Sequence, residues 1–166
     1  MTHYGSMATD VQDLVDDDRI TLWGLFLEAH HMISESLWAD VEAVFPYPEA
    51  WFEVLLRLSR SPGGAQPMTR LARMVLFSSG GFTKLADRME AEGLIRRVAC
   101  PDDRRSSLAT ITPKGRRVLD RGLRTHLPSL DKHFLANLDD TQQVQLEAIL
   151  RTLRDGACVL DPETLE

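Results

Sequence analysis

Apolar residues recur every three or four positions along much of this chain, which is the spacing of amphipathic α-helices. The first such stretch begins near Arg19 and ends before Pro46, and a helix of about 26 residues extends about 39 Å. That length exceeds what a small domain covers with its own core, so the pattern predicts a partner surface, most simply a second copy. The stripe consists of Leu22, Phe26, Ala29, Ile33, Leu37, Val41 and Val44, widened by Leu25, Met32 and Ala39.

Prolines, glycines and capping residues divide the following stretch into shorter helices. Pro46 and Pro48 end the first helix and open a second one. Residues 61–67 (SPGGAQP) predict a loop. Thr69 and Ser78 are candidate N-caps of two short helices, and Gly93 suits a left-handed helix end. The inward positions of these three helices are Trp51, Val54, Leu55, Leu58, Leu71, Ala72, Val75, Leu76, Phe82, Leu85, Ala86 and Met89.

The second half of the chain predicts a hairpin and two more helices. Residues 95–100 and 107–112 are rich in strand-forming side chains and flank the turn sequence PDDRR. Thr112 and Pro113 predict the start of a long helix that Pro128 is expected to kink or interrupt. Asp139 with Gln142 resembles a capping box before a final helix. The chain is therefore expected to be mainly α-helical with a small β-hairpin, in a winged helix-turn-helix arrangement.

Charge is distributed unevenly along the sequence. The net charge is −6, yet residues 69–117 hold eleven Lys and Arg against five Asp and Glu, a balance of +6. The remaining residues carry a balance of −12. One basic segment in an acidic protein is typical of a localised nucleic-acid interface.

The basic segment has the parts that a DNA-binding helix-turn-helix needs. Short hydroxyl and cationic side chains on the second helix are able to reach phosphates and base edges in a major groove. At the hairpin tip, Arg104 and Arg105 are suited to a narrow minor groove, and Asp103 is placed to orient a guanidinium. The outward positions of the second helix are Ser79, Gly80, Thr83, Lys84, Asp87 and Arg88.

Residues 71–119 resemble the winged-helix core of the MarR (multiple antibiotic resistance regulator) family of transcription factors. The resemblance is carried by LA at residues 71–72, KLADRMEAEGLIRR at 84–97, PDDRR at 101–105 and TPKG at 112–115. It implies a ligand-responsive regulator, by family default a repressor, that binds a pseudo-palindromic operator on double-stranded DNA as a homodimer. The implied DNA-binding residues are Thr69, Arg70, Ser78, Ser79, Gly80, Gly81, Thr83, Lys84, Arg88, Asp103, Arg104 and Arg105. Gly80-Gly81 departs from the family by removing base-reading side chains.

The resemblance also implies a small aromatic or phenolic effector, bound between the dimerising helices and the DNA-binding winged helix-turn-helix of each protomer. Aromatic and polar candidates for this site are Trp23, His30, Trp51 and Phe52. A role for the same residues in the hydrophobic core is the alternative interpretation, and the sequence favours it.

The expected organisation has four parts. Residues 1–18 form a flexible acidic lead, in which residues 1–6 have the pattern of a tag remnant before Met7. Residues 19–60 hold the N-terminal helices, residues 61–117 the winged helix-turn-helix, and residues 118–166 the C-terminal dimerisation helices. No secretory signal or bilayer-spanning run is evident, and two distant cysteines favour a reducing cytoplasm.

Other functions are less well supported by the sequence. His30 and His31 are adjacent, and His126 and His133 lack metal-ligand spacing, so no metal or cofactor is expected. Cys100 flanks the basic hairpin, where a redox role is weaker than a plain strand position. Catalytic motifs are missing, which argues against an enzyme. A winged helix that contacts only proteins remains the alternative function.

Overall fold

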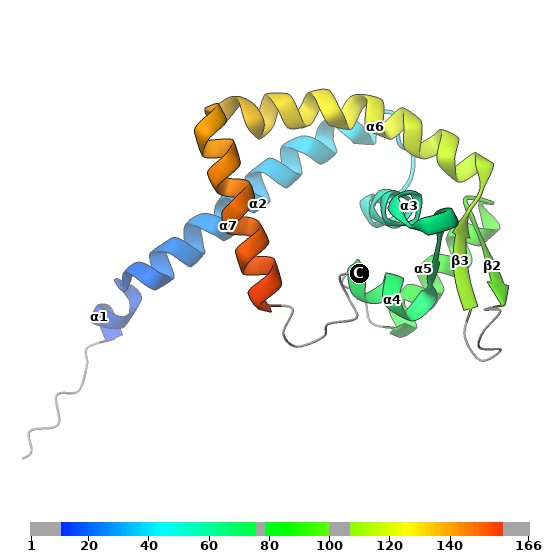
Figure 1. Ribbon diagram of the computed structural model, residues 1–166, viewed down its shortest axis with the longest axis horizontal. Coiled ribbons are helices and arrows are strands. Elements are labelled where there is room, and N and C mark those ends of the chain that lie inside the picture. The colour runs from blue at the N-terminus through cyan, green and yellow to red at the C-terminus, as the bar shows by residue number, and fades with distance from the viewer. Residues whose placement is uncertain (1–10, 76–78, 100–106, 158–166) are drawn as a thin grey trace, which may run out of the picture.

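The computed structural model describes residues 11–75, 79–99 and 107–157, and it confirms the predicted fold class (Figure 1). A three-stranded antiparallel sheet is surrounded by helices, and short 3₁₀ turns occupy Pro62–Gly64 and Leu135–Asn137. The helices are α1 (Val11–Val15), α2 (Asp18–Glu42), α3 (Glu49–Arg60), α4 (Met68–Met74), α5 (Ser79–Ala91), α6 (Pro113–His133) and α7 (Asp140–Ala157). The strands are β1 (Ala65–Pro67), β2 (Ile95–Ala99) and β3 (Ser107–Ile111).

Local hydrogen bonds explain why several helices begin and end where the sequence predicts. The Thr112 hydroxyl accepts a hydrogen bond from the Gly115 N–H at 3.0 Å, which caps α6. Asp139 and Gln142 form the predicted capping box before α7, with reciprocal bonds of 3.0 and 2.9 Å. Gly93 follows α5 with φ of 67°, the left-handed conformation that glycine adopts without strain. These predictions are confirmed.

Three local predictions are wrong. Ala65–Pro67 forms strand β1 rather than a loop, because its backbone pairs antiparallel with Leu108–Thr110 of β3. Thr69 is not an N-cap: Pro67 occupies that position, and Thr69 lies inside the first turn of α4. The interruption predicted at Pro128 does not occur, because α6 continues from Pro113 to His133 although the proline has no N–H to donate to the preceding turn; a kink there stays a prediction.

One hydrophobic core joins α3, α4, α5 and the sheet to the end of α2 and the first half of α6. We call α3 to α5 with the three strands the head, and residues 11–37 with α7 the arms. Gly122 permits close packing of α6 on α3, because a Cβ atom there would lie 2.8 Å from the Phe52 ring. The most deeply buried side chains are Phe45, Val54, Leu55, Leu58, Leu71, Phe82, Met89, Leu94 and Ile95.

Helix α6 connects the head to the arms. It leaves the sheet after β3, passes over the head beside α2, and is followed by α7, which turns back (Figure 1). Polar contacts fix the α2–α6 crossing: the Ser129 hydroxyl donates to Asp40 Oδ2 at 2.7 Å, and His133 Nε2 lies 2.9 Å from the same oxygen. These two partners hold the pKa of the Asp40 carboxyl below its usual range.

Candidate nucleic-acid interface

Helix α5 has one buried face and one exposed face, as its sequence predicts. Phe82, Leu85, Ala86 and Met89 are at most 4% exposed and attach the helix to the core. Four residues predicted to face outward do so: Thr83, Lys84, Asp87 and Arg88 are exposed, as is the Gly80 backbone, while Gly81 is partly buried. Ser79 is the first residue of the helix. The helix thus presents hydroxyl and cationic groups on a single surface.

Arg97 of β2 braces α5 against the sheet. Its guanidinium donates to Glu90 Oε2 at 2.9 Å and to the Asp87 carboxylate, and its backbone N–H donates to Glu90 Oε1 at 2.7 Å. These bonds, the backbone N–H above all, hold the pKa of the Glu90 carboxyl below its usual range. The pairing engages the Asp87 carboxylate, so the exposed cations of α5 act beside an acid that is already neutralised.

Sequence reasoning missed this brace. Seven and ten residues separate Arg97 from Glu90 and Asp87, and the close approach depends on the turn at Gly93. The one signal in the sequence was the glycine at position 93. It allows a tight helix-to-strand turn, which places the start of the strand beside the preceding helix.

Helix α4 precedes α5 and carries two further residues that the sequence predicts to bind DNA. Thr69 is exposed in its first turn. Arg70 is partly buried, and its Nε is enclosed without a hydrogen-bond partner. Such an unpaired buried donor favours a site that is completed by another molecule, since buried N–H groups are usually bonded.

The hairpin wing is described at its base only. β2 and β3 pair from Ile95 with Ile111 to Ala99 with Ser107. The predicted residues Ser78, Asp103, Arg104 and Arg105, together with Cys100, lie outside the described residues. Their roles stay predictions.

The four effector candidates do not converge on one place. Trp23 is 60% exposed and stacks on Phe26 near the start of α2, and His30 is exposed on the same helix. Trp51 and Phe52 are buried in the core, where Trp51 stacks on Tyr47 with ring centroids 5.1 Å apart. Among the four, Phe52 lines a cavity that the structure contains.

That cavity has a volume of about 200 Å³ and lies between α2, α3 and α6. The Phe52 ring meets the His126 ring edge to face, with centroids 5.2 Å apart. Burial lowers the pKa of His126, against a smaller opposing effect of the Glu53 charge. The cavity is lined by Ser34, Leu37, Trp38, Val41, Glu49, Phe52, Glu53 and His126.

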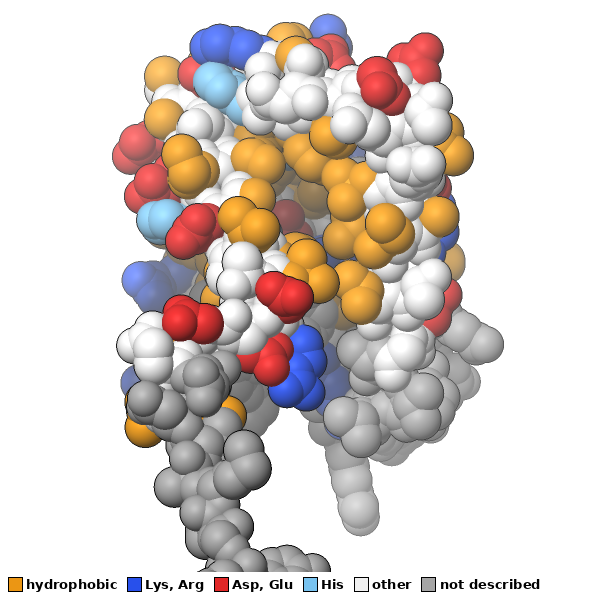
Figure 2. All heavy atoms as spheres, turned by 90° about the vertical axis from the view of Figure 1, so that its left-hand side faces the viewer, with side chains coloured by type: hydrophobic (Ala, Val, Ile, Leu, Met, Phe, Trp, Pro, Cys, Tyr) orange, Lys and Arg blue, Asp and Glu red, His pale blue; other side chains and the backbone are white. Residues whose placement is uncertain are grey.

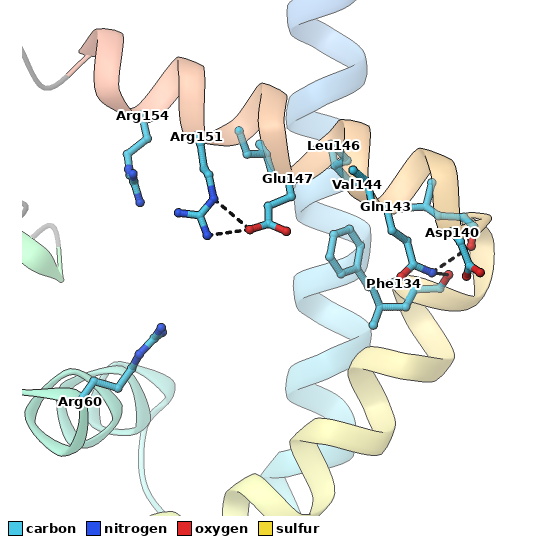
Figure 3. A pocket seen from close by; sticks show the side chains of 12 residues that line it. Arg60, Phe134, Asp140, Gln143, Val144, Leu146, Glu147, Arg151 and Arg154 are labelled. Carbon is cyan, nitrogen blue, oxygen red and sulfur yellow. Dashed lines mark hydrogen bonds and ion pairs between the residues drawn. The ribbon is translucent and has the colours of Figure 1, made fainter.

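The arms leave much apolar surface uncovered. Figure 2 shows hydrophobic side chains gathered on this face of the molecule, beside a central hollow. An open pocket of about 730 Å³ extends from α7 to Arg60 at the end of α3, as Figure 3 shows. The large hydrophobic residues exposed on the arms are Val11, Leu14, Val15, Ile20, Leu22, Trp23, Leu25, Phe26, Leu27, Met32, Val144, Ile149, Leu150 and Leu153.

Residues 11–75, 79–99 and 107–157 contain neither a group of metal ligands nor a membrane-spanning helix. Within these ranges no three His, Cys, Asp or Glu residues are grouped so that they could hold a metal ion. No helix in the same ranges is long and apolar enough to span a bilayer.

Comparison with known proteins adds independent information. The MarR family model matches residues 46–106. The HTH-type transcriptional regulator MhqR of Bacillus subtilis is 35% identical over 88 residues, which are 53% of this chain and 61% of MhqR. This chain therefore spans less than two thirds of that relative.

Solved structures resemble the chain over a larger share of its length. Sco3205 of Streptomyces coelicolor, a MarR family transcriptional regulator crystallised in complex with DNA, is 26% identical with a TM-score of 0.75, over 84% of this chain and 87% of Sco3205. AbsC, a MarR family transcriptional regulator of the same organism, is 26% identical with a TM-score of 0.76, over 85% and 95% of the two chains.

The family model covers most of the head, and the structural similarity includes much of the arms. MarR family members are transcription regulators and not enzymes. By sequence and fold, this chain is similar to transcription regulators of the MarR family.

Proposed function

We propose that this chain is a cytoplasmic, ligand-responsive transcriptional repressor that binds a pseudo-palindromic operator as a homodimer. Helix α5 enters the major groove, and the wing arginines Arg104 and Arg105 reach the minor groove. The observation that carries the proposal is the exposed face of α5, on which Lys84 and Arg88 lie beside Thr83 and the bare backbone of Gly80. Sco3205, which shares the fold, was crystallised with DNA.

Gly80 supports a close approach to phosphate. A Cβ atom added there meets nothing within 4 Å, so packing does not require glycine at this position. A helix N-terminus with exposed N–H groups suits an anion, and the missing side chain lets the backbone come near one.

A gel shift with a salt titration tests DNA binding, on an operator selected from random duplexes. A protein making about six to ten phosphate contacts loses roughly 10³- to 10⁵-fold in affinity between about 50 and 200 mM salt. Lys84→Ala and Arg88→Ala are expected to weaken binding, whereas Arg124→Ala on α6, which removes an exposed cation paired with Asp120, serves as the control. Failure to bind any duplex at low salt, or indifference to salt, favours the protein-contact alternative.

The arms support the homodimer. Helices α2 and α7 expose Leu22 (71%), Met32 (68%), Val144 (70%) and Leu153 (58%), which a soluble monomer rarely leaves in one contiguous area. A second copy with the same surface covers them in a self-complementary, two-fold interface. Two heads then meet half-sites about one helical turn, or 34–36 Å, apart. Sedimentation equilibrium tests the stoichiometry, and a strict monomer contradicts it.

The cavity beside Phe52 supports a ligand response. It touches α2 and α6, which extend into or toward the arms, and α3, which belongs to the head. A ligand that prefers one arrangement of head and arms shifts the population toward it, and thereby changes the spacing of the two reading helices. The release of operator DNA by a bound small molecule in the gel shift tests this response.

A further inference from the structure

The residues that line the cavity between α2, α3 and α6 indicate which charge its ligand has. Its lining holds two carboxylates, Glu49 and Glu53, and includes no lysine or arginine. The two acids are four residues apart on α3, so they lie on the same face of the helix, one turn apart. A ligand in this cavity therefore meets negative charge along the α3 side.

The surroundings neutralise this charge only in part. Arg57 Nε lies 3.4 Å from Glu53 Oε2 and is enclosed without a hydrogen bond, so Arg57 offsets part of the Glu53 charge. Glu49 is exposed, and within the residues that the structure describes its side chain forms no hydrogen bond or ion pair. Burial lowers the pKa of His126, which keeps its ring neutral at neutral pH and adds no compensating cation.

The remaining lining is aromatic and aliphatic. Trp38 of α2 and Phe52 of α3 contribute rings, with Leu37 and Val41 beside them. Tryptophan is the aromatic side chain that attracts a cation most strongly over its face. A volume of about 200 Å³ admits one six-membered ring with a short arm, because a cavity of about 150 Å³ already accommodates benzene.

We propose that this cavity binds a small monocyclic aromatic cation, of the arylalkylamine class. The ring occupies the space beside Trp38 and Phe52, and the ammonium group lies at the carboxylates of Glu49 and Glu53. An aromatic acid of the same size meets two like charges there and is excluded. This inference rests on the proposed effector site, but binding is measurable without DNA.

Three compounds of nearly equal shape but different charge show how charge affects binding affinity. They are the cation 2-phenylethylamine, the neutral 2-phenylethanol and the anion phenylacetate. Each is titrated into the full-length protein by calorimetry and by tryptophan fluorescence, with Trp38→Phe identifying the Trp38 signal. We expect the amine to bind at least tenfold more tightly than the alcohol and more tightly still than the acid, with salt weakening the amine alone. An equal or greater affinity for phenylacetate or phenylethanol, or no binding of the amine at millimolar concentration, overturns the proposal.

Carboxamide variants test the two acids directly. Glu49→Gln and Glu53→Gln are each expected to weaken amine binding at least threefold, and the double variant at least tenfold, with phenylethanol affinity unchanged. Glu28→Gln on the exposed face of α2 makes the same charge change away from the cavity and is the control. Thermal unfolding checks that the variants fold. Unchanged amine affinity in a folded double variant contradicts the assignment.

The same probes added to the operator gel shift distinguish the two proposals. If the amine binds and DNA stays bound, the ligand class stands and the ligand-responsive function fails. If phenylacetate releases DNA and the amine does not bind, the ligand class fails and the ligand-responsive function stands. Release of DNA by the amine, abolished in the double variant, supports both.

Discussion

The head and the arms both consist mainly of helices rich in apolar residues, but the head buries these residues and the arms leave many of them exposed. In the head, Leu55, Leu58, Leu71 and Met89 have no exposed surface. In the arms, residues of the same kind, such as Leu22, remain mostly exposed. The apolar residues of α3 gather on one face, whereas the exposed apolar residues of α2 lie around most of the helix. The head buries its apolar residues within the chain, and the arms leave many of theirs exposed, which is why we propose that a second copy covers them.

The largest effect is expected from charging the arms. Leu22→Asp with Ile149→Asp places four carboxylates in a symmetric interface that otherwise buries four apolar side chains. Burial of each is worth about 1.5–3 kcal/mol, so dimerisation is expected to weaken by at least about 6 kcal/mol, roughly 10⁴-fold. Sedimentation equilibrium measures the change, with Ser59→Asp at an exposed position of α3, outside the arms, as the control. A dimer that survives the double substitution places the interface elsewhere.

The second prediction concerns the core of the head. Leu58→Ala removes a fully buried side chain and is expected to cost about 2–5 kcal/mol of unfolding free energy in urea titrations. Because the head folds within one chain, the loss should be the same in the Leu22→Asp/Ile149→Asp background and at every protein concentration. If the loss of unfolding free energy depends on protein concentration, the head does not fold independently of the arms, which contradicts the comparison.

A smaller effect is expected at the junction between reading helix and wing. Arg97→Ala removes two side-chain bonds from β2 to α5, and it leaves the Asp87 carboxylate without its guanidinium partner and Glu90 with the backbone N–H bond alone. We expect operator affinity to fall about tenfold, or about 1.4 kcal/mol, together with a lower melting temperature. Arg96→Ala, at the exposed neighbouring position, should leave the melting temperature unchanged. Equal melting temperatures for both variants contradict a bracing role.

The smallest effect is a pH dependence at the boundary between the regions. Burial lowers the pKa of His126 in the folded state, so the unfolded chain takes up the proton first as pH falls. Stability is therefore expected to decrease as pH drops below about 6.5, the ordinary pKa of histidine, toward the folded pKa. Melting curves measured at falling pH test this, and His126→Asn should flatten the dependence while His31→Asn at an exposed site should not. A variant with an unchanged pH profile assigns the dependence to other groups.

Much of the fold follows from local sequence signals. The bounds of α2, the core face of α3 and the caps at Thr112 and Asp139 depend on neighbouring residues, and they agree with the structure. Strand β1 escaped prediction because Ala-Gln-Pro has no strand pattern and exists as a strand through its pairing with β3. The same pairing carries extended backbone as far as Pro67, which places Thr69 inside α4.

The site was predictable to a lesser extent, because its members come from distant parts of the chain. The exposed face of α5 follows from helical periodicity, so the exposure of Lys84 and Arg88 was predictable. The pairing of Arg97 with Asp87 and Glu90 depends on a turn, and the cavity depends on three helices that meet around Phe52. Glu49, Glu53 and Trp38 give no local sign that they share a cavity, since α2 and α3 read separately as ordinary amphipathic helices.

The continuity of α6 has a mechanical consequence. Its 21 residues form a rod about 31 Å long, anchored at one end to the wing strand β3 and at the other to the Asp40 crossing. A tilt of about 5° about the Asp40 end displaces the wing end by about 3 Å. In the proposed dimer the two displacements add, so a small rearrangement near the pivot changes the separation of the two heads by a larger distance.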